Sequence, residues 1–403
     1  MIIPKKLFTV RVAIALLLFL GCLASPAVCT EPAPASGDRA APPGDQTVKN
    51  APTPSFQDYA LFIAGLKGRQ NPLSAEEAKP VWANHAKVIN QSWANYNKRQ
   101  LAVMREWAGK ELSGMEVRNV FYPFSGPDFV NMFALFPKAP NYLMLSLEPV
   151  GDLPDIAAGE GNSFFPRLQR SLYDLLHLTF FITPKLEASL GNKELSGVLP
   201  VLLFFMAREG LIVEDVKYWV MKADGSIEET EASPVPVKVG PGDISGLRLV
   251  FKRPGAGSPQ TLYYFRFNIA NENFEKNKPF LSFLEKFAPF TSFSKAASYL
   301  MYRPRYSNIR DFIMNHSQYV VQSDSVIPLQ YFDKDTWDLR FYGAYSSPIA
   351  LFSSRYQKDL AAVYQKGQDI KPLPFGFCYR YRPRTSNLMF ASQKASLEEN
   401  QAK

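Results

Sequence analysis

The chain is poor in the side chains that build crosslinks and metal sites. Its 403 residues include three cysteines, Cys22, Cys29 and Cys378, and three histidines. The sequence contains neither the His-Glu-x-x-His spacing of a zinc site nor the Cys-x-x-Cys-His motif of a haem site. A fold with so few cysteines must be stabilised by its hydrophobic core, and we predict no metal and no cofactor.

Catalytic motifs are equally scarce. A Gly-x-Ser-x-Gly nucleophile elbow does not occur, and Gly255-Ala256-Gly257-Ser258 lacks the following helix of a phosphate-binding loop. Ser292-Phe293-Ser294-Lys295 has the Ser-x-x-Lys spacing of penicillin-binding proteins and serine β-lactamases, but no Lys-Thr-Gly follows it. We interpret that match as a coincidence.

Long hydrophobic runs and basic runs are absent from the body of the chain. The longest apolar stretch, Gly197 to Ala207, is interrupted by Pro200 and followed by Arg208 and Glu209, which is typical of a buried helix. We therefore expect a soluble body. The formal net charge of +8 comes with no nucleic-acid-binding module, so we exclude nucleic acid as a partner.

The N-terminus has the pattern of an export signal. Lys5, Lys6 and Arg11 precede an apolar run, Val12 to Leu20, that is shorter than the roughly 20 residues needed to cross a bilayer. We predict a signal peptide over residues 1–21 and an exported protein. Removing the three cations lowers the formal charge from +8 to +5, which suits anionic lipid headgroups or polysaccharide. Solvated surface lysines explain this charge equally well.

The residues at the end of the apolar run resemble the lipobox of bacterial lipoproteins. Phe19-Leu20-Gly21-Cys22 supplies an apolar residue, a small residue and the cysteine, although Phe19 and Leu20 depart from the usual choices. The resemblance implies lipidation of Cys22, and Leu23 after it implies sorting to the outer membrane. The alternative is ordinary signal-peptidase cleavage after Ala27 or Cys29.

A segment rich in Pro, Ala, Gly, Ser and Thr follows the cysteine. Residues 22–54 contain almost no large apolar side chains, so they cannot bury enough surface to offset their ordering entropy. We predict a disordered tether; the alternative is a disordered N-terminus without a role. Cys29 in this segment could pair with Cys378 in an oxidising compartment, but two free thiols are the favoured interpretation.

The remaining chain predicts one α+β domain over residues 55–390, with a possible subdivision near residue 210 and a polar tail over 391–403. Its 31 Phe and 19 Tyr can form a large core. An apolar stripe from Val81 to Trp107 predicts one long helix or two in series, with one slip in the spacing. Further predicted helices cover 56–63, a segment from Ser74 with a capping box to Glu77, 166–178, 197–209 and, mostly, 277–318 and 354–366.

Alternating side chains predict a mainly antiparallel sheet packed with the helical N-terminal part. In 246–252 and 261–269, apolar residues alternate with polar or basic ones, which indicates one buried face and one partly wet face. The predicted strands cover residues 120–122, 142–147, 211–221, 246–252, 261–269 and 377–382.

The three histidines have structural interpretations. His85 lies on the apolar stripe and His177 within Leu-Leu-His-Leu, so we predict that both are core residues with satisfied hydrogen bonds. His316 is expected at a helix end, where a cation suits the helix dipole.

The segment Tyr122 to Asp128 is the most distinctive local feature. Pro123, Gly126 and Pro127 constrain its backbone, so Ser125 and Asp128 are candidates for a polar site of an envelope hydrolase. The favoured interpretation is that Asp128 caps a helix starting at Phe129 while Ser125 belongs to the turn.

A second set of candidates is basic. Arg380, Arg382 and Arg384 alternate with aromatic residues, as do basic residues in 246–269. These residues could bind an anionic envelope glycan or lipid. The sequence leaves the ligand and the oligomeric state open.

Three segments resemble a group of uncharacterised exported bacterial proteins: Phe121–Phe129, Leu147–Gly151 and Gln260–Phe265. The resemblance would cover most of the chain after the tether and implies no activity. The sequence as a whole predicts a lipid-anchored or periplasmic envelope protein and favours a binding or structural role over an enzymatic one.

The anchor can be tested at Cys22. Replacing the lipid-accepting thiol, Cys22→Ser, should release the protein from the membrane fraction, because the tether itself has no affinity for lipid. Cell fractionation measures the change. Unchanged fractionation would refute the anchor.

Overall fold

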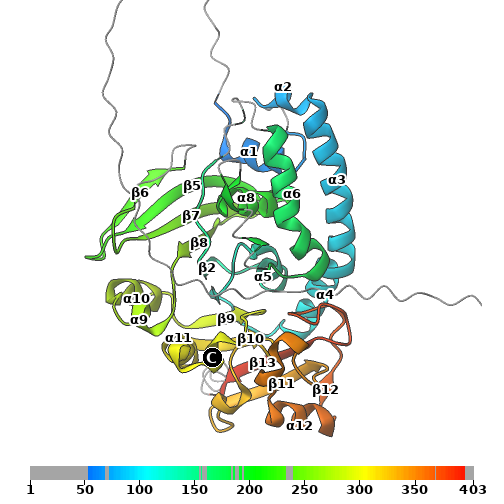
Figure 1. Ribbon diagram of the computed structural model, residues 1–403, viewed down its shortest axis with the longest axis vertical. Helices are drawn as coiled ribbons and strands as arrows, with labels where there is room; N and C mark the ends of the chain where they lie inside the picture. Colours follow the sequence, from blue (N-terminus) through cyan, green and yellow to red (C-terminus); the bar gives the residue numbers. More distant parts are fainter. Residues whose placement is uncertain are drawn as a thin grey trace, which may run out of the picture. The chain divides into compact units, whose positions relative to one another are not determined.

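The computed structural model describes residues 53–68, 72–153, 156, 161–182, 185–186, 190–192, 195–232, 239–367 and 369–394 (Figure 1). The predicted signal peptide, Cys22, Cys29, nearly all of the predicted tether and the tail from residue 395 lie outside the described residues. The described residues all belong to one compact unit.

A mixed sheet of eleven strands runs through the described body, and its helices lie mainly in the N-terminal part. The chain is therefore an α+β protein, as predicted. In spatial order the strands are β12 (Ile370–Lys371), β11 (Trp337–Gly343), β13 (Asn387–Gln393), β10 (Ser317–Gln322), β9 (Phe290–Ser294), β1 (Asn119–Pro123), β2 (Asn141–Ser146), β8 (Gln260–Arg266), β7 (Ile244–Lys252), β5 (Ile212–Met221) and β6 (Ile227–Glu231).

The centre of this sheet is parallel, and its flanks are antiparallel except for the parallel edge pair of β11 and β12. β10, β9, β1, β2 and β8 pair in parallel with one another. β13 is antiparallel to both β10 and β11, and β8, β7, β5 and β6 form an antiparallel series. Numbered by their own sequence order, β8-β2-β1-β9-β10-β11 run 3-2-1-4-5-6, with β13 inserted before the last strand. This is the strand order of doubly wound sheets.

Helices of the described residues cover both faces of the central strands. They are α1 (Phe56–Ile63), α2 (Ser74–Glu77), α3 (Pro80–Tyr96), the π-helical turn η1 (Asn97–Leu101), α4 (Ala102–Glu111), α5 (Phe129–Leu135), α6 (Gly161–Leu178), α8 (Leu199–Arg208), α9 (Asn271–Phe274), α10 (Lys278–Glu285), α11 (Ser307–His316) and α12 (Lys358–Lys366). Short 3-10 turns are η2 (Leu300–Tyr302), η3 (Pro304–Tyr306), η4 (Leu329–Tyr331) and η5 (Ala350–Arg355), and β3 (Gly191–Asn192) pairs with β4 (Leu195–Ser196).

Side chains of the central strands alternate between two cores. Val120 and Tyr122 of β1 belong to the core that packs against α1, α3, α4, α5, α6 and α8, whereas Phe121 belongs to the core beneath α9, α10 and α11. Strands covered on both faces have nearly continuous apolar sequences. On the flank, Arg248 of β7 remains partly exposed opposite buried Leu247 and Leu249, which confirms the predicted wet face there.

The slip in the long apolar stripe has a structural cause. η1 inserts one wider turn between α3 and α4, which shifts the spacing of the buried face by one residue. The two helices in series are therefore confirmed. The predicted helix over 56–63 is also confirmed, and Gly65 after it has a left-handed φ of 65°.

Two local predictions are wrong, and a third is incomplete. Ser74 lies inside α2 and the N-cap is Leu73, without a side-chain cap bond, so the capping box is absent there. Residues 377–382 form a turn because Cys378 has a φ of 62°, and the C-terminal strand is β13. The segment 277–318 is mostly helical, as predicted, but it also contains β9. That strand was not predicted because its residues are all buried and show no alternation.

No helix among the described residues is long and apolar enough to cross a membrane.

Two of the three histidines follow their predictions. His85 is 1% exposed, with Nε2 donating to the Ile63 carbonyl at 2.9 Å and Nδ1 facing the Gln169 amide nitrogen at 3.0 Å. His316 ends α11. His177 is exposed and stacks on Tyr173, so its core interpretation is wrong: it lies on the solvent-accessible surface of α6.

Burial lowers the pKa of His85 from 6.5 to about 4, because the ring loses water that would solvate its charge. A second proton on Nδ1 would also face the Gln169 amide. An unfolded chain binds that proton near pH 6.5, so the stability due to neutral His85 is present above pH 6.5 and is lost as the pH falls toward 4.

The variant His85→Gln should remove this pH dependence. Between pH 7 and pH 4 the stability advantage of the native protein over the variant should shrink by about 3 kcal/mol. Urea unfolding at several pH values measures it. A difference that stays constant over this range would contradict the assignment.

Candidate functional site

Several buried polar residues lie at the carboxyl ends of the parallel strands. The chain leaves β1 toward β2 on one side and leaves β9 toward β10 on the other, although β1 and β9 are neighbours. In doubly wound sheets ligands bind where adjacent connections diverge in this way. Asp128 follows β1 and Lys295 follows β9, so both stand at this point.

Asp128 and Lys295 form a buried ion pair. Lys295 Nζ lies 2.7 Å from Asp128 Oδ2, and the two side chains are 1% and 3% exposed. Taking two charges out of water costs several kcal/mol for each ion, so such a pair is tolerated only when its remaining donors and acceptors are satisfied.

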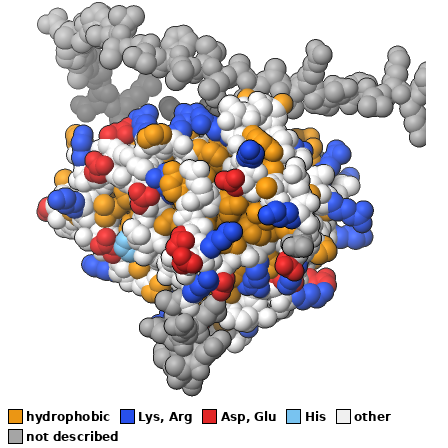
Figure 2. All heavy atoms as spheres, turned by 90° about the horizontal axis from the view of Figure 1, so that it is seen from below, with side chains coloured by type: hydrophobic (Ala, Val, Ile, Leu, Met, Phe, Trp, Pro, Cys, Tyr) orange, Lys and Arg blue, Asp and Glu red, His pale blue; other side chains and the backbone are white. Residues whose placement is uncertain are grey.

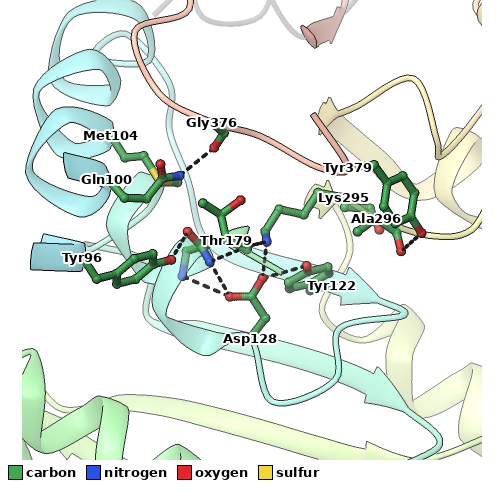
Figure 3. Close-up of polar contacts among 12 residues, drawn as sticks. Tyr96, Gln100, Met104, Tyr122, Asp128, Thr179, Lys295, Ala296, Gly376 and Tyr379 are labelled. Carbon is green, nitrogen blue, oxygen red and sulfur yellow. Dashed lines mark hydrogen bonds and ion pairs between the residues drawn. The ribbon is translucent and has the colours of Figure 1, made fainter. Parts of the chain in front are cut away.

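Neighbouring groups supply the remaining hydrogen bonds of the pair (Figure 3). Tyr122 donates its hydroxyl to Asp128 Oδ2 at 3.2 Å, and the Asn131 amide donates to Asp128 Oδ1 at 2.7 Å. Lys295 also donates to the Thr179 carbonyl. Tyr96 of α3 donates to the Asn131 side-chain oxygen at 2.9 Å. The network thus joins α3, β1, α5, the end of α6 and the end of β9.

Burial, followed by the charge of Asp128, raises the pKa of Tyr122 well above its usual range. Burial also raises the pKa of Tyr96. Both hydroxyls therefore keep their protons and act as donors at every physiological pH.

Strained backbone concentrates around this network. Eight non-glycine residues of the described chain have a left-handed φ. Six of them border the carboxyl edge: Phe124 after β1, Ala296, Ser298 and Tyr299 after β9, Thr179 beside Lys295, and Cys378 beside the loop after β10. Each such residue costs on the order of 1–2 kcal/mol, so the surrounding contacts must over-determine the conformation.

A second polar cluster lies beside the first, at the end of β10. The Tyr299 hydroxyl donates to Asp324 at 2.5 Å, and Asn387 donates to the same carboxyl group at 3.0 Å. Burial raises the pKa of Asp324 and raises that of the Cys378 thiol to about 11. A thiol with that pKa is neutral and unreactive, so Cys378 is a structural residue, and it is a free cysteine.

The edge does not fit a nucleotide. α5 is seven residues long, and its N-cap is the carboxylate of Asp128, which would repel a phosphate. Glu148 after β2 is buried and accepts from Ser146. Phe181 and Leu186 lie over Gly126, within 4 Å of the position a Cβ would occupy there.

Ser125 and Asp128 are brought close together, but in structural roles. Asp128 caps α5 through the Asn131 backbone N–H at 3.4 Å, which confirms the favoured interpretation. The Ser125 hydroxyl donates to the Leu145 carbonyl at 3.2 Å, and Ser125 is 4% exposed. In the described part of the chain, neither side chain contacts a histidine or arginine through a hydrogen bond or ion pair.

The three arginines proposed as an anionic-ligand site do not share one environment. Arg380 donates to the carbonyl oxygens of Ser347 and Pro348, whereas Arg382 and Arg384 are exposed. On the flank of the sheet, Arg248 pairs with Glu229 and Asp215. The positive charge on the exposed face of residues 246–252 is therefore largely neutralised by neighbouring carboxylates.

An open cavity of about 810 Å³ lies between α3 and α6, which run side by side (Figure 1). Its apolar walls include Ile89 of α3, Leu176 of α6 and the following Phe181 and Leu186. Its charged lining residues are Arg167, Arg170, Asp174 and Lys185.

Sequence reasoning missed the central residue of the network. In the sequence, Lys295 stands out only as the last residue of the Ser-x-x-Lys match. Ser292 of that match forms a hydrogen bond with Ser317 of β10, which agrees with the interpretation of the match as a coincidence. The signal that could locate Lys295 is its position directly after strand β9. The sequence pattern of 277–318, however, predicts a mostly helical segment. Asn131, Tyr96 and Thr179 carried no signal.

Among the described residues, no three His, Cys, Asp or Glu side chains are placed to hold a metal ion. Comparison of the chain with protein-family models and with curated proteins finds no match.

Breaking the ion pair should be costly. Lys295→Met leaves the Asp128 charge buried and unpaired, which should lower the free energy of unfolding by about 3–5 kcal/mol. The double variant Asp128→Asn, Lys295→Met should be more stable than the single one, because no charge is then buried and Asn still caps a helix. Chemical denaturation measures both.

The matched control is Lys185→Met. Lys185 pairs with Asp174 at 3.3 Å but is 62% exposed, so its loss should cost less than about 1 kcal/mol. Equal losses for the two lysine variants would show that burial does not set the energy of the Lys295 pair.

Proposed function

We propose that this chain is an exported cell-envelope protein, lipid-anchored at Cys22 or periplasmic, that acts by binding a ligand and not by catalysis. The address is supported by the signal-type N-terminus, the lipobox-like residues before Cys22 and the Pro/Ala-rich segment after it. The cavity and the closed polar network of the folded body support the binding role.

The cavity between α3 and α6 is the observation that carries the binding function. Its volume of about 810 Å³ lies within the range of roughly 300–1,000 Å³ that is usual for small-molecule sites. Its lining is mostly apolar with a few charged groups, which is the common composition of such sites.

The polar network supports binding over catalysis. Asp128 and Lys295 satisfy each other and are almost inaccessible, so neither can act on a substrate without unfolding the edge. The alternative of an envelope hydrolase would need Ser125 and Asp128 to reach a substrate, and both are buried with their hydrogen bonds made inside the protein.

A secondary contact with an anionic envelope polymer or lipid stays a proposal for Arg382 and Arg384. Figure 2 shows that, on the face seen from below, basic and acidic side chains are interspersed around hydrophobic ones. That face carries no continuous basic surface, which makes an extended polyanion a weaker candidate than a small ligand in the cavity.

Filling the cavity should abolish binding of an apolar probe. N-phenyl-1-naphthylamine, a neutral fluorophore, should brighten on mixing with the full-length protein. Ser92→Trp places a large ring in the cavity and should reduce that signal at least tenfold, because Ser92 lines it.

The matched control is Gln91→Trp, one residue away on the exposed side of α3, which should leave binding unchanged. If the probe does not bind, or binds equally to both variants, the cavity is not a ligand site. For the address, Cys29→Ser is the control that should retain the membrane association lost in Cys22→Ser.

A further inference from the structure

The cavity has a long apolar side. Ile89, Leu176 and Leu186 are each less than 5% exposed and form part of its wall. Val88 and Tyr173, at 40% and 57% exposed, are two of the few large apolar side chains left open to solvent, and both line this cavity. Exposed apolar side chains around one concavity indicate an apolar ligand.

The charges of the lining are unbalanced. Three of its four charged side chains are cationic: Arg167, Arg170 and Lys185. The single carboxylate, Asp174, is already paired with Lys185 at 3.3 Å, and its side chain is 10% exposed. Arg170 therefore contributes positive charge to the cavity that no hydrogen bond or ion pair of the described residues meets.

Arg170 is the group available to a ligand. In the part of the chain that the structure describes, Arg170 makes no hydrogen bond or ion pair, and it is exposed at the cavity. Arginine presents a rigid fork of donors that suits carboxylate and phosphate groups. Gln169, its neighbour in sequence, is instead held by His85.

We propose that the ligand of the α3–α6 cavity is an anionic amphiphile, with its apolar chain along Ile89, Leu176 and Leu186 and its carboxylate or phosphate head on Arg170. This assignment rests on the proposed binding function and names its ligand class. A cationic amphiphile would meet uncompensated positive charge, and a glycan would leave the apolar wall without a partner.

Displacement of N-phenyl-1-naphthylamine from the full-length protein tests the ligand class. The competitors are dodecanoate, dodecyl phosphate, dodecanol and dodecyltrimethylammonium, all below their micelle concentrations, and inorganic phosphate alone. Both anionic amphiphiles should displace the probe at concentrations about tenfold lower than dodecanol, as expected for one charge-assisted contact. The cationic amphiphile should be weaker than dodecanol, and inorganic phosphate should not compete.

Arg170→Gln should bring the anionic amphiphiles close to dodecanol while leaving dodecanol unchanged. The matched control Lys87→Gln removes an exposed charge of α3 that does not line the cavity and should keep the preference. Preference for dodecanoate over dodecyl phosphate, or the reverse, would identify the head group.

The outcomes separate the two proposals. If dodecanol competes as well as dodecanoate, or if Arg170→Gln has no effect while Ser92→Trp still abolishes probe binding, the ligand class is wrong and the binding function stands. If Ser92→Trp leaves every affinity unchanged, both proposals fail.

Discussion

The buried ion pair between Asp128 and Lys295 is the contact on which the central sheet depends. It joins the segments that leave two neighbouring parallel strands in opposite directions. A buried pair is stabilising only if its remaining hydrogen bonds are made, and Tyr122, Asn131 and the Thr179 carbonyl make them. The left-handed residues around it are the conformational cost of bringing these groups together.

The same pair fills the carboxyl edge of the sheet, and the open cavity lies elsewhere, between α3 and α6. A doubly wound sheet offers its ligand crevice at the point that Asp128 and Lys295 fill here. The segment after α6 connects the two places: Thr179 accepts from Lys295, while Phe181 and Leu186 line the cavity on α6 and lie over Gly126. The cavity wall and the network are thus joined by one short segment of chain.

Much of the local structure could be predicted from the sequence. α1, the helix pair interrupted by η1 and the cap at Asp128 depend on residues three or four positions apart, which a sequence displays directly. β1 and β2 are short apolar runs followed by turn residues, which a sequence also displays. The prediction failed for β9, because a strand covered on both faces has no alternation to distinguish it from a buried helix. That error also hid Lys295.

By itself the sequence determined the α+β class, the helical N-terminal part, the scarcity of catalytic motifs and the cap role of Asp128. Only the tertiary structure decided that the centre of the sheet is parallel, that Lys295 meets Asp128 across 167 positions of chain, and that a cavity opens between α3 and α6. The physical reason is the separation in sequence of the residues that interact. Turns, caps and helical faces are set by neighbours in the chain, whereas the partner of a buried charge and the shape of a cavity are set by residues that meet only after folding.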